Sequence, residues 1–112
     1  MAIINLKEKQ FEYYDSLGGV ENKECIGLMK RYLKGESKDK RKKPLDLSDW
    51  TCVFNPPGLP MQENNYDCGV FVAQYARWLS RSNVLPPPFN QSHISHLRKQ
   101  MIVELLTNEL LA

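Results

Sequence analysis

One cysteine in this chain stands where a nucleophile would be placed. Cys68 follows a polar, turn-forming segment and comes just before residues 70–79, whose apolar side chains recur at helical spacing. The pattern predicts that Cys68 begins a helix. The unpaired backbone N–H groups and the positive dipole end of a helix start favour an anion, so they favour the thiolate, which is the nucleophilic form of cysteine.

A carboxamide lies a short distance upstream of this cysteine. Gln62 belongs to the polar segment, and a loop that folds back over the helix start would let its amide donate to the oxyanion of a tetrahedral intermediate. The alternative interpretation is structural. Cysteine is commonly a small buried hydrophobe, and Asn, Asp and Gly beside Cys68 also suit an ordinary cap and turn.

Two motifs in the chain resemble those of the sentrin/SUMO-specific proteases, papain-like cysteine peptidases that process ubiquitin-like modifiers. The family's Pro-Gln-Gln-x-Asn-x-x-Asp-Cys-Gly run is similar to residues 60–69, and its Tyr-Tyr-Asp-Ser run is similar to residues 13–16. The resemblance implies that Cys68 is the nucleophile, Gln62 the oxyanion donor and Asp15 the carboxylate that orients a histidine. Without the resemblance, Asp15 reads as a turn residue ahead of Gly-Gly.

The similarity covers nearly the whole chain, with three departures. Met61 replaces a common glutamine, and residues 65–66 replace a small pair. The third departure is larger, because the family's catalytic histidine belongs to a His-Trp pair that would fall just ahead of Met1. The resemblance is therefore to the C-terminal part of the catalytic domain. We expect either a fragment of a larger polypeptide or a naturally shortened relative.

The only two histidines are His93 and His96, in the C-terminal helical region. Their spacing of three could in principle hold a metal ion, but no third ligand is suggested nearby, so we interpret them as surface or helix-packing residues. The resemblance implies no metal and no organic cofactor.

The composition of the chain limits which functional classes fit it. The chain has 112 residues, 42% of them hydrophobic, which suits one core and a single domain over residues 1–112. A net charge of +2 is too small to indicate nucleic-acid binding. Three cysteines without C-x-x-C spacing indicate neither disulfides nor zinc, and they favour a reducing compartment. With no apolar run long enough to span a bilayer, we expect a soluble, intracellular protein without membrane contact.

The first sixteen residues predict a β-hairpin. Residues 1–6 form a nearly continuous apolar run, typical of a strand buried on both faces, and residues 7–10 form a polar turn. Residues 11–16 alternate, which places Asp15 on the face that carries Phe11 and Tyr13.

Helical spacing returns over residues 22–33, with Cys25 on the apolar face as a core residue and Gly35 as the stop. The basic run at residues 38–43 has three interpretations that stay open: a solvated loop, a nuclear-import signal or a contact for an acidic partner.

A strand over residues 50–54 and a proline-rich loop over residues 55–60 lead to Gln62. Residues 80–90, with three consecutive prolines, predict a surface connection. A final helix then begins with Ser92 as its cap. Its apolar stripe consists of Ile94, Leu97, Met101, Ile102, Leu105 and Leu106.

These elements predict an α+β architecture in which a small antiparallel sheet packs with the Cys68 helix and the final helix. The resemblance implies the C-terminal part of a papain-like protease fold, and three hypotheses about function. The first is a cysteine peptidase that cleaves after the Gly-Gly terminus of a SUMO-like modifier, with the modifier and its conjugates as partners, in the nucleus or at the nuclear envelope. The second is an inactive modifier-binding module, and the third is a deneddylase-like enzyme.

Overall fold

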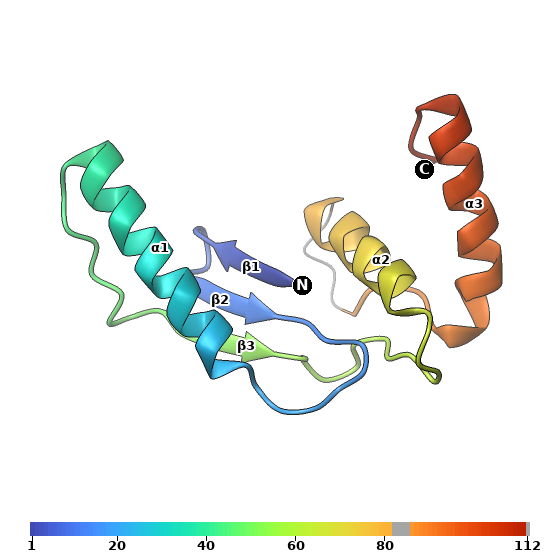
Figure 1. Cartoon of the computed structure of the whole chain (residues 1–112), viewed down its shortest axis with the longest axis horizontal. Coiled ribbons are helices and arrows are strands. Elements are labelled where there is room, and N and C mark those ends of the chain that lie inside the picture. The colour runs from blue at the N-terminus through green and yellow to red at the C-terminus, as the bar shows by residue number, and fades with distance from the viewer. Residues whose placement is uncertain (82–85, 112) are drawn as a thin grey trace. The chain divides into compact units, whose positions relative to one another are not determined.

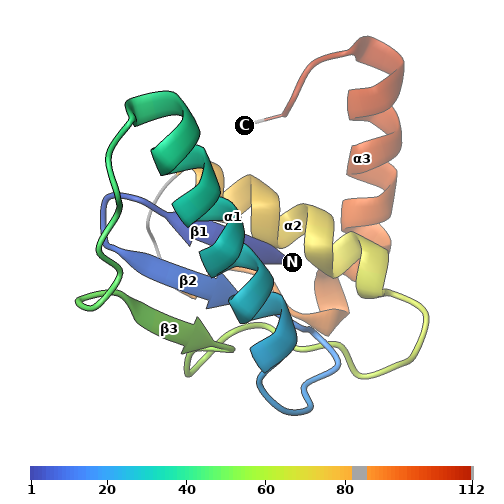
Figure 2. The same ribbon diagram turned by 60° about the vertical axis from the view of Figure 1, so that its left-hand side comes forward.

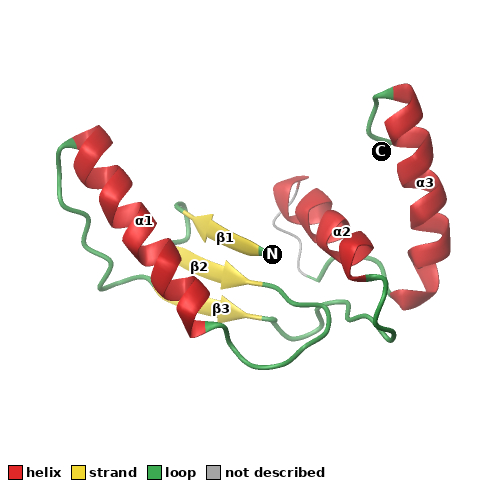
Figure 3. Cartoon of the chain, in the orientation of Figure 1, coloured by secondary structure: helices red, strands yellow, loops and turns green. Residues whose placement is uncertain are grey.

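The structure is a computed structural model that describes residues 1–81 and 86–111 (Figure 1). Figure 3 distinguishes its helices, strands and loops. In chain order the elements are β1 (Ala2–Asn5), β2 (Gln10–Tyr13), α1 (Lys23–Arg41), β3 (Thr51–Phe54), α2 (Cys68–Arg81), the 3₁₀ turn η1 (Gln91–His93) and α3 (Ile94–Thr107).

Two compact units make up the chain. Unit 1 consists of Met1–Tyr14 and Gly19–Pro56, and unit 2 of Asp15–Gly18 and Pro57–Ala112. Unit 1 therefore contains the sheet and α1, whereas unit 2 contains α2, η1 and α3. A single domain over residues 1–112 stays a prediction.

The sheet of unit 1 has the order β1-β2-β3. The predicted hairpin is confirmed, because β1 pairs antiparallel with β2, Ala2 opposite Tyr13. The prediction of an antiparallel sheet is wrong for the other pair: β3 runs parallel to β2, with Phe11 opposite Cys52. The physical reason is the connection. Helix α1 lies between these strands in the chain, and a helical crossover of this kind joins parallel neighbours. The α+β class is confirmed.

Aromatic side chains form the core of unit 1. Phe11 and Tyr14 are fully buried, and the Phe11 ring lies 4.9 Å from the ring of Trp50. Helix α1 lies across β2 (Figures 1 and 2) and buries Ile26. The prediction that the first strand is buried on both faces is wrong, because Ala2 is exposed and the rest of β1 is only half-buried. An edge strand has a partner on one side alone.

Helix α1 is longer than predicted. It begins after Asn22, whose Oδ1 accepts the Cys25 N–H at 2.9 Å, and it continues through Gly35 to Arg41. A helical glycine costs about 1 kcal/mol relative to alanine, which the lysines and glutamates around it can offset. The stop is instead Lys42, in the left-handed region at φ 57°. Cys25 is half-buried rather than a core residue.

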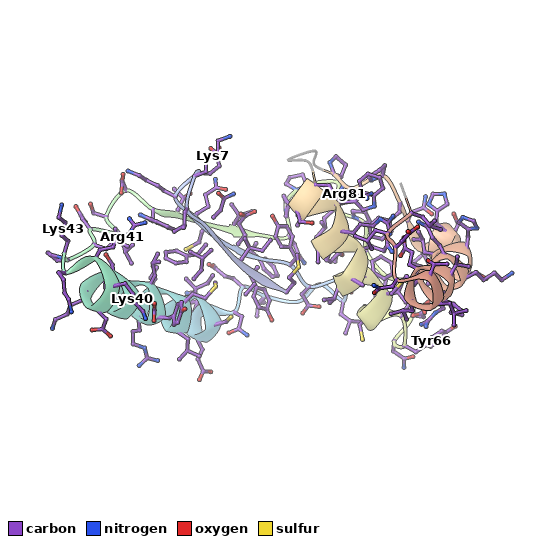
Figure 4. All side chains as sticks on the ribbon, turned by 90° about the horizontal axis from the view of Figure 1, so that it is seen from above. Lys7, Lys40, Arg41, Lys43, Tyr66 and Arg81 are labelled. Carbon is purple, nitrogen blue, oxygen red and sulfur yellow. The ribbon has the colours of Figure 1, made fainter. Side chains whose placement is uncertain are left out.

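The basic run belongs mainly to the end of this helix. Residues 38–43 are all exposed, and Figure 4 labels Lys40, Arg41 and Lys43 there. Cations in the last turn interact favourably with the negative end of the helix dipole. The run is therefore not the loop that one interpretation expected, although its exposure keeps the other two open.

Unit 2 is built on α2. The predicted helix start at Cys68 is confirmed, and the helix buries Val70, Phe71, Gln74 and Tyr75. Phe89 follows the proline run and closes this core, with its ring 5.5 Å from Phe71 and 6.1 Å from Tyr75. The surface connection predicted for residues 80–90 is wrong at its start, because α2 continues through Ser80 to Arg81, and wrong at Phe89, which is buried. Residues 82–85 of the predicted connection lie outside the described residues.

The start of α3 differs from the prediction in its cap. Ser92 does not cap α3, because the N-cap of this helix is His93, which makes no side-chain capping hydrogen bond. Asn90 instead caps the preceding turn η1: its Oδ1 accepts the Ser92 N–H at 2.9 Å, while the ring of His93 accepts the Asn90 N–H at 3.0 Å. Within the described residues, no helix combines the length and apolar character needed to cross a membrane.

Candidate active site

Cys68 is the first residue of α2 and its side chain is exposed. The carbonyl of Asp67 accepts the N–H groups of Val70 at 3.0 Å and Phe71 at 3.2 Å, which closes the first turn. The first N–H groups of a helix have no acceptor within the helix. The backbone N–H of Cys68, at the first position of α2, is therefore a candidate oxyanion donor.

Three hydrogen bonds hold Gln62. Its N–H donates to the carbonyl of Ser16 at 3.0 Å, and the hydroxyl of Ser16 donates to Gln62 Oε1 at 2.5 Å. Gln62 Nε2 donates to the carbonyl of Asn64 at 2.6 Å. These partners determine which way the carboxamide faces. Because an amide NH₂ carries two hydrogens, one N–H remains to serve an oxyanion.

Asp15 occupies a turn, as the structural interpretation expected. Its Oδ1 accepts the Leu17 N–H at 3.0 Å, and its carbonyl accepts the Gly18 N–H at 3.0 Å. Two effects raise the pKa of Tyr75, which lies in α2. Burial of the Tyr75 hydroxyl is the larger effect, and the negative charge of the Asp15 carboxylate is the second. Tyr75 lies two helical turns beyond Cys68 and so shares its side of the helix.

Ser16 joins these parts. It lies next to Asp15, and its hydroxyl and carbonyl both bind Gln62. The turn at Asp15 and the loop at Gln62, far apart in the sequence, are therefore bound together within unit 2. Unit 2 contains all three predicted site residues, with Cys68 at the start of α2.

The loop between Gln62 and Cys68 is held by Asn64. Its Oδ1 accepts the N–H groups of Tyr66 at 3.2 Å and Asp67 at 3.1 Å, and its Nδ2 donates to Asp67 Oδ2 at 2.7 Å. A side chain that bonds the backbone two and three residues ahead stabilises a tight turn. The loop therefore delivers the chain to Cys68 in one defined conformation.

Asp67 anchors this loop to the rest of unit 2. Its buried carboxylate accepts from Arg98 at 2.5 and 3.2 Å and from Gln91 at 2.9 Å. The bonds from Arg98 and then Asn64 hold the pKa of Asp67 below its usual range. Asn64 and Asp67 belong to the motif that carries Cys68, so their types were a signal for this support. Arg98 gave no such signal in the sequence, because it belongs to α3 and only folding brings α3 to this loop.

Comparison with known proteins places the chain in a family. Residues 1–109 match the Ulp1 protease family, C-terminal catalytic domain. The chain is 38% identical over 112 residues to the sentrin-specific protease of Caenorhabditis elegans, covering 100% of this chain and 16% of that protein. Identity to human Sentrin-specific protease 2 is 38% over 112 residues, covering 99% and 18%. The chain belongs to the Ulp1 protease family.

A solved structure has the same fold. The C-terminal Ulp1 protease domain in complex with SMT3, the yeast ortholog of SUMO, matches with a TM-score of 0.71 at 24% identity. The match covers 95% of this chain and 45% of the solved chain. This chain thus spans less than half of that domain, and less than a fifth of the two sentrin-specific proteases above.

Proposed function

We propose that this chain carries the nucleophile and oxyanion part of a cysteine peptidase that cleaves after the Gly-Gly terminus of a SUMO-like modifier. The bond joins the modifier to a precursor tail or to a target lysine. The observation that carries the proposal is the exposed Cys68 at the start of α2, preceded by a Gln62 amide held in one orientation. The names of the sentrin-specific relatives support the modifier class.

In this mechanism the Cys68 thiolate attacks the carbonyl carbon of the terminal glycine. The free N–H of Gln62 and the backbone N–H of Cys68 stabilise the oxyanion. The intermediate collapses to a thioester as the C–N bond breaks, and the leaving amine takes a proton from a histidine imidazolium. Water, deprotonated by the same histidine, then hydrolyses the thioester and releases the modifier and the thiol. Asp15 orients that histidine.

We propose that a polypeptide segment outside these residues supplies the histidine. His93 takes part in the cap of η1, where its ring accepts a backbone N–H. His96 lies one turn further on, in α3. General-base assistance contributes about 10² to 10⁴ in rate, so without the histidine the chain turns over slowly.

The test compares the 112-residue chain with a chimaera that joins it to the remaining catalytic domain of the C. elegans relative. We expect the chain alone to leave a SUMO precursor essentially uncleaved and the chimaera to cleave it. Cys68→Ala and Asp15→Asn should abolish or strongly lower hydrolysis by the chimaera. The control is the double variant His93→Ala and His96→Ala, which should cleave normally. Rapid cleavage by the short chain, retained in that double variant, would contradict the mechanism.

The absence of the family's His-Trp pair from these 112 residues favours a second candidate for the isolated chain, a module that binds the modifier without cleaving it. A chimaera that binds SUMO but leaves its precursor intact would support this binding function. The choice of substrate distinguishes a deneddylase-like enzyme from a SUMO-specific one. A deneddylase-like enzyme should cleave a NEDD8 precursor in preference to a SUMO precursor. The triad chemistry is the same in both enzymes, so only the modifier surface decides between them.

We also propose a nuclear or nuclear-envelope location for the protein. The exposed basic run at residues 38–43 supports this, because clusters of Lys and Arg serve as import signals. A fluorescent fusion should accumulate in nuclei, and replacing Lys40 and Arg41 by Ser should spread it through the cell. The control is Lys99→Ser, which removes a positive charge outside the basic run. Arg98 is left unchanged in this control because it binds Asp67.

A further inference from the structure

A pocket of about 380 Å³ lies in unit 1, whereas the residues of the candidate active site belong to unit 2. Its wall is built from the turn between β1 and β2, the second half of α1 and the loop that leads to β3 (Figures 1 and 2). Pockets of about 300 to 1,000 Å³ are large enough to enclose a side chain or a small ligand. The mechanism proposed above gives this pocket no task.

The pocket has an apolar part to which all three segments contribute. Leu6 comes from the turn and Leu33 from α1, and Leu45 and Trp50 come from the loop. The ring of Trp50 lies 4.9 Å from that of the buried Phe11, so this part is continuous with the core of unit 1. Leu6 is 61% exposed, and the other three lining residues are half-buried. An apolar group that entered the pocket would therefore remove apolar surface from water, which favours binding.

Hydrogen bonds between the three segments fix the shape of the pocket. The carbonyl of Lys9, in the turn, accepts the N–H of Thr51 at 3.1 Å, and Lys9 Nζ lies 2.6 Å from Asp49 Oδ2. The hydroxyl of Ser37, in α1, donates to the carbonyl of Lys43 at 3.1 Å. The loop is therefore bound to the turn and to α1. A pocket that already has its bound shape loses less conformational freedom when a ligand binds.

Cations outnumber carboxylates at this pocket. The charged side chains of the lining are three cations and two carboxylates: Lys9, Lys40, Arg41, Glu36 and Asp46. Within residues 1–81 and 86–111, neither Lys40 nor Arg41 forms a salt bridge, although Glu36 lies one turn before Lys40. Both cations belong to the exposed run at residues 38–43 (Figure 4), which has five cationic residues and a single acidic one. The pocket therefore has cations available to bind an anionic group.

The lining favours an acidic peptide over a nucleic acid. Glu36 and Asp46 would repel a phosphate backbone, which has a negative charge at every nucleotide. Trp50 is the one aromatic side chain among the described residues of the lining, and it is half-buried, so it offers a base only part of its surface for stacking. A peptide can instead place an apolar side chain in the pocket and direct its carboxylates to Lys40 and Arg41.

We propose that this pocket binds an acidic protein segment, with a leucine or phenylalanine side chain in the apolar part and carboxylates at Lys40 and Arg41. Ion pairs of this kind give specificity and speed the encounter, and the apolar contact adds affinity. The proposal is independent of peptidase activity. It also differs from an import signal, which depends on the basic run alone, because it requires the turn that carries Leu6.

The test titrates the isotope-labelled 112-residue chain with the synthetic peptide Glu-Asp-Glu-Leu-Phe-Glu-Asp-Glu and follows the indole N–H signals by NMR. The chain has two tryptophans, of which Trp50 lines the pocket and Trp78 lies in α2. We expect the Trp50 signal to shift until it saturates and the Trp78 signal to stay in place. The variant Trp78→Phe assigns the two signals.

Two pairs of variants separate the charge from the apolar contact, with binding measured by the anisotropy of a fluorescein-labelled peptide. Lys40→Glu should weaken binding about five- to tenfold, because attraction becomes repulsion, whereas Lys99→Glu, on α3, should not. Leu6→Ser should weaken binding about three- to tenfold, whereas Leu106→Ser, also exposed and outside the pocket, should not. Circular dichroism checks that each variant is folded. The same variants are measured in the chimaera described above, so the result does not depend on the fold of the isolated chain.

Four outcomes would overturn the proposal. The first is a Trp50 signal that does not move, and the second is equal binding by the Lys40→Glu and Lys99→Glu variants. The third is undiminished binding of a peptide in which serine replaces leucine and phenylalanine, because charge alone would then explain the contact. The fourth is tighter binding of a single-stranded thymidine octamer at the same ionic strength, which would assign the pocket to nucleic acid.

Discussion

Helices α2 and α3 have the same length, 14 residues, and both are rich in apolar residues, yet they are packed very differently. Helix α2 buries Val70, Phe71, Gln74 and Tyr75, whereas α3 buries only Ile94 and Glu104. An apolar stripe therefore indicates that a helix packs against something, but not that the partner belongs to the same stretch of chain. The helix that bears Cys68 is packed within the described residues, whereas the distal half of α3 is exposed.

Replacing one apolar residue in each helix tests this contrast most strongly. Phe71→Ala should lower the free energy of unfolding by about 3–5 kcal/mol, because a fully buried ring leaves a cavity. Leu105→Ala should change it by less than about 0.5 kcal/mol, as for most surface substitutions. Urea unfolding followed by circular dichroism measures both. Similar losses for the two variants would show that α3 is packed within the chain after all.

The next largest effect should come from the loop that precedes α2. In the chimaera with the remaining catalytic domain, Gln62→Ala should lower kcat by about 10² to 10³, the cost of one oxyanion donor, with KM little changed. Steady-state kinetics on a SUMO precursor measures both constants. Gln100→Ala, an amide on α3, is the matched control and should keep its kcat. A Gln62 variant with weaker binding but normal turnover would make Gln62 a binding residue.

The anchor between this loop and α3 should make stability depend on pH. The pKa of Asp67 is lower in the folded chain than in the unfolded one, and the same holds for Glu104. Both groups therefore stabilise the fold above their unfolded pKa values of about 4, and this contribution is lost as the pH falls through the folded values.

Thermal unfolding between pH 6 and pH 2.5 measures this dependence. The melting temperature should fall steadily below about pH 4. In Asp67→Asn it should start lower and vary less with pH, because the charged partner of Arg98 is gone. An unchanged slope in that variant would mean that other carboxylates produce the acid sensitivity.

The smallest predicted effect concerns thiol reactivity. Cys52 and Cys68 are both exposed, so accessibility does not separate them, and only Cys68 lies at a helix start. Iodoacetamide at neutral pH should label Cys68 several-fold faster than Cys52, since a helix N-terminus favours the thiolate. Peptide mapping by mass spectrometry gives the ratio. Faster labelling of Cys52 than of Cys68 would show that the helix start does not activate the thiol.

Local patterns of the sequence determined the elements of this protein and the start of the nucleophile's helix. Apolar periodicity and the polar segment ahead of Cys68 predicted α2, and alternation predicted the hairpin of β1 and β2. These signals act over a few residues, so a sequence displays them directly. Helix ends were less predictable, because Gly35 suits a stop but is only weakly unfavourable inside a helix.

Only the tertiary structure decided which distant groups meet. The Ser16 hydroxyl orients Gln62 across 46 residues of sequence, and Arg98 binds Asp67 across 31. The parallel direction of β3 also depends on tertiary structure, as does the lack of a hydrogen-bond partner for Gln74 Oε1 among the described residues. Each depends on how separate elements pack, which no local pattern encodes. The residue types of a site can thus be read from the sequence, whereas its support is set by contacts that form only when the chain folds.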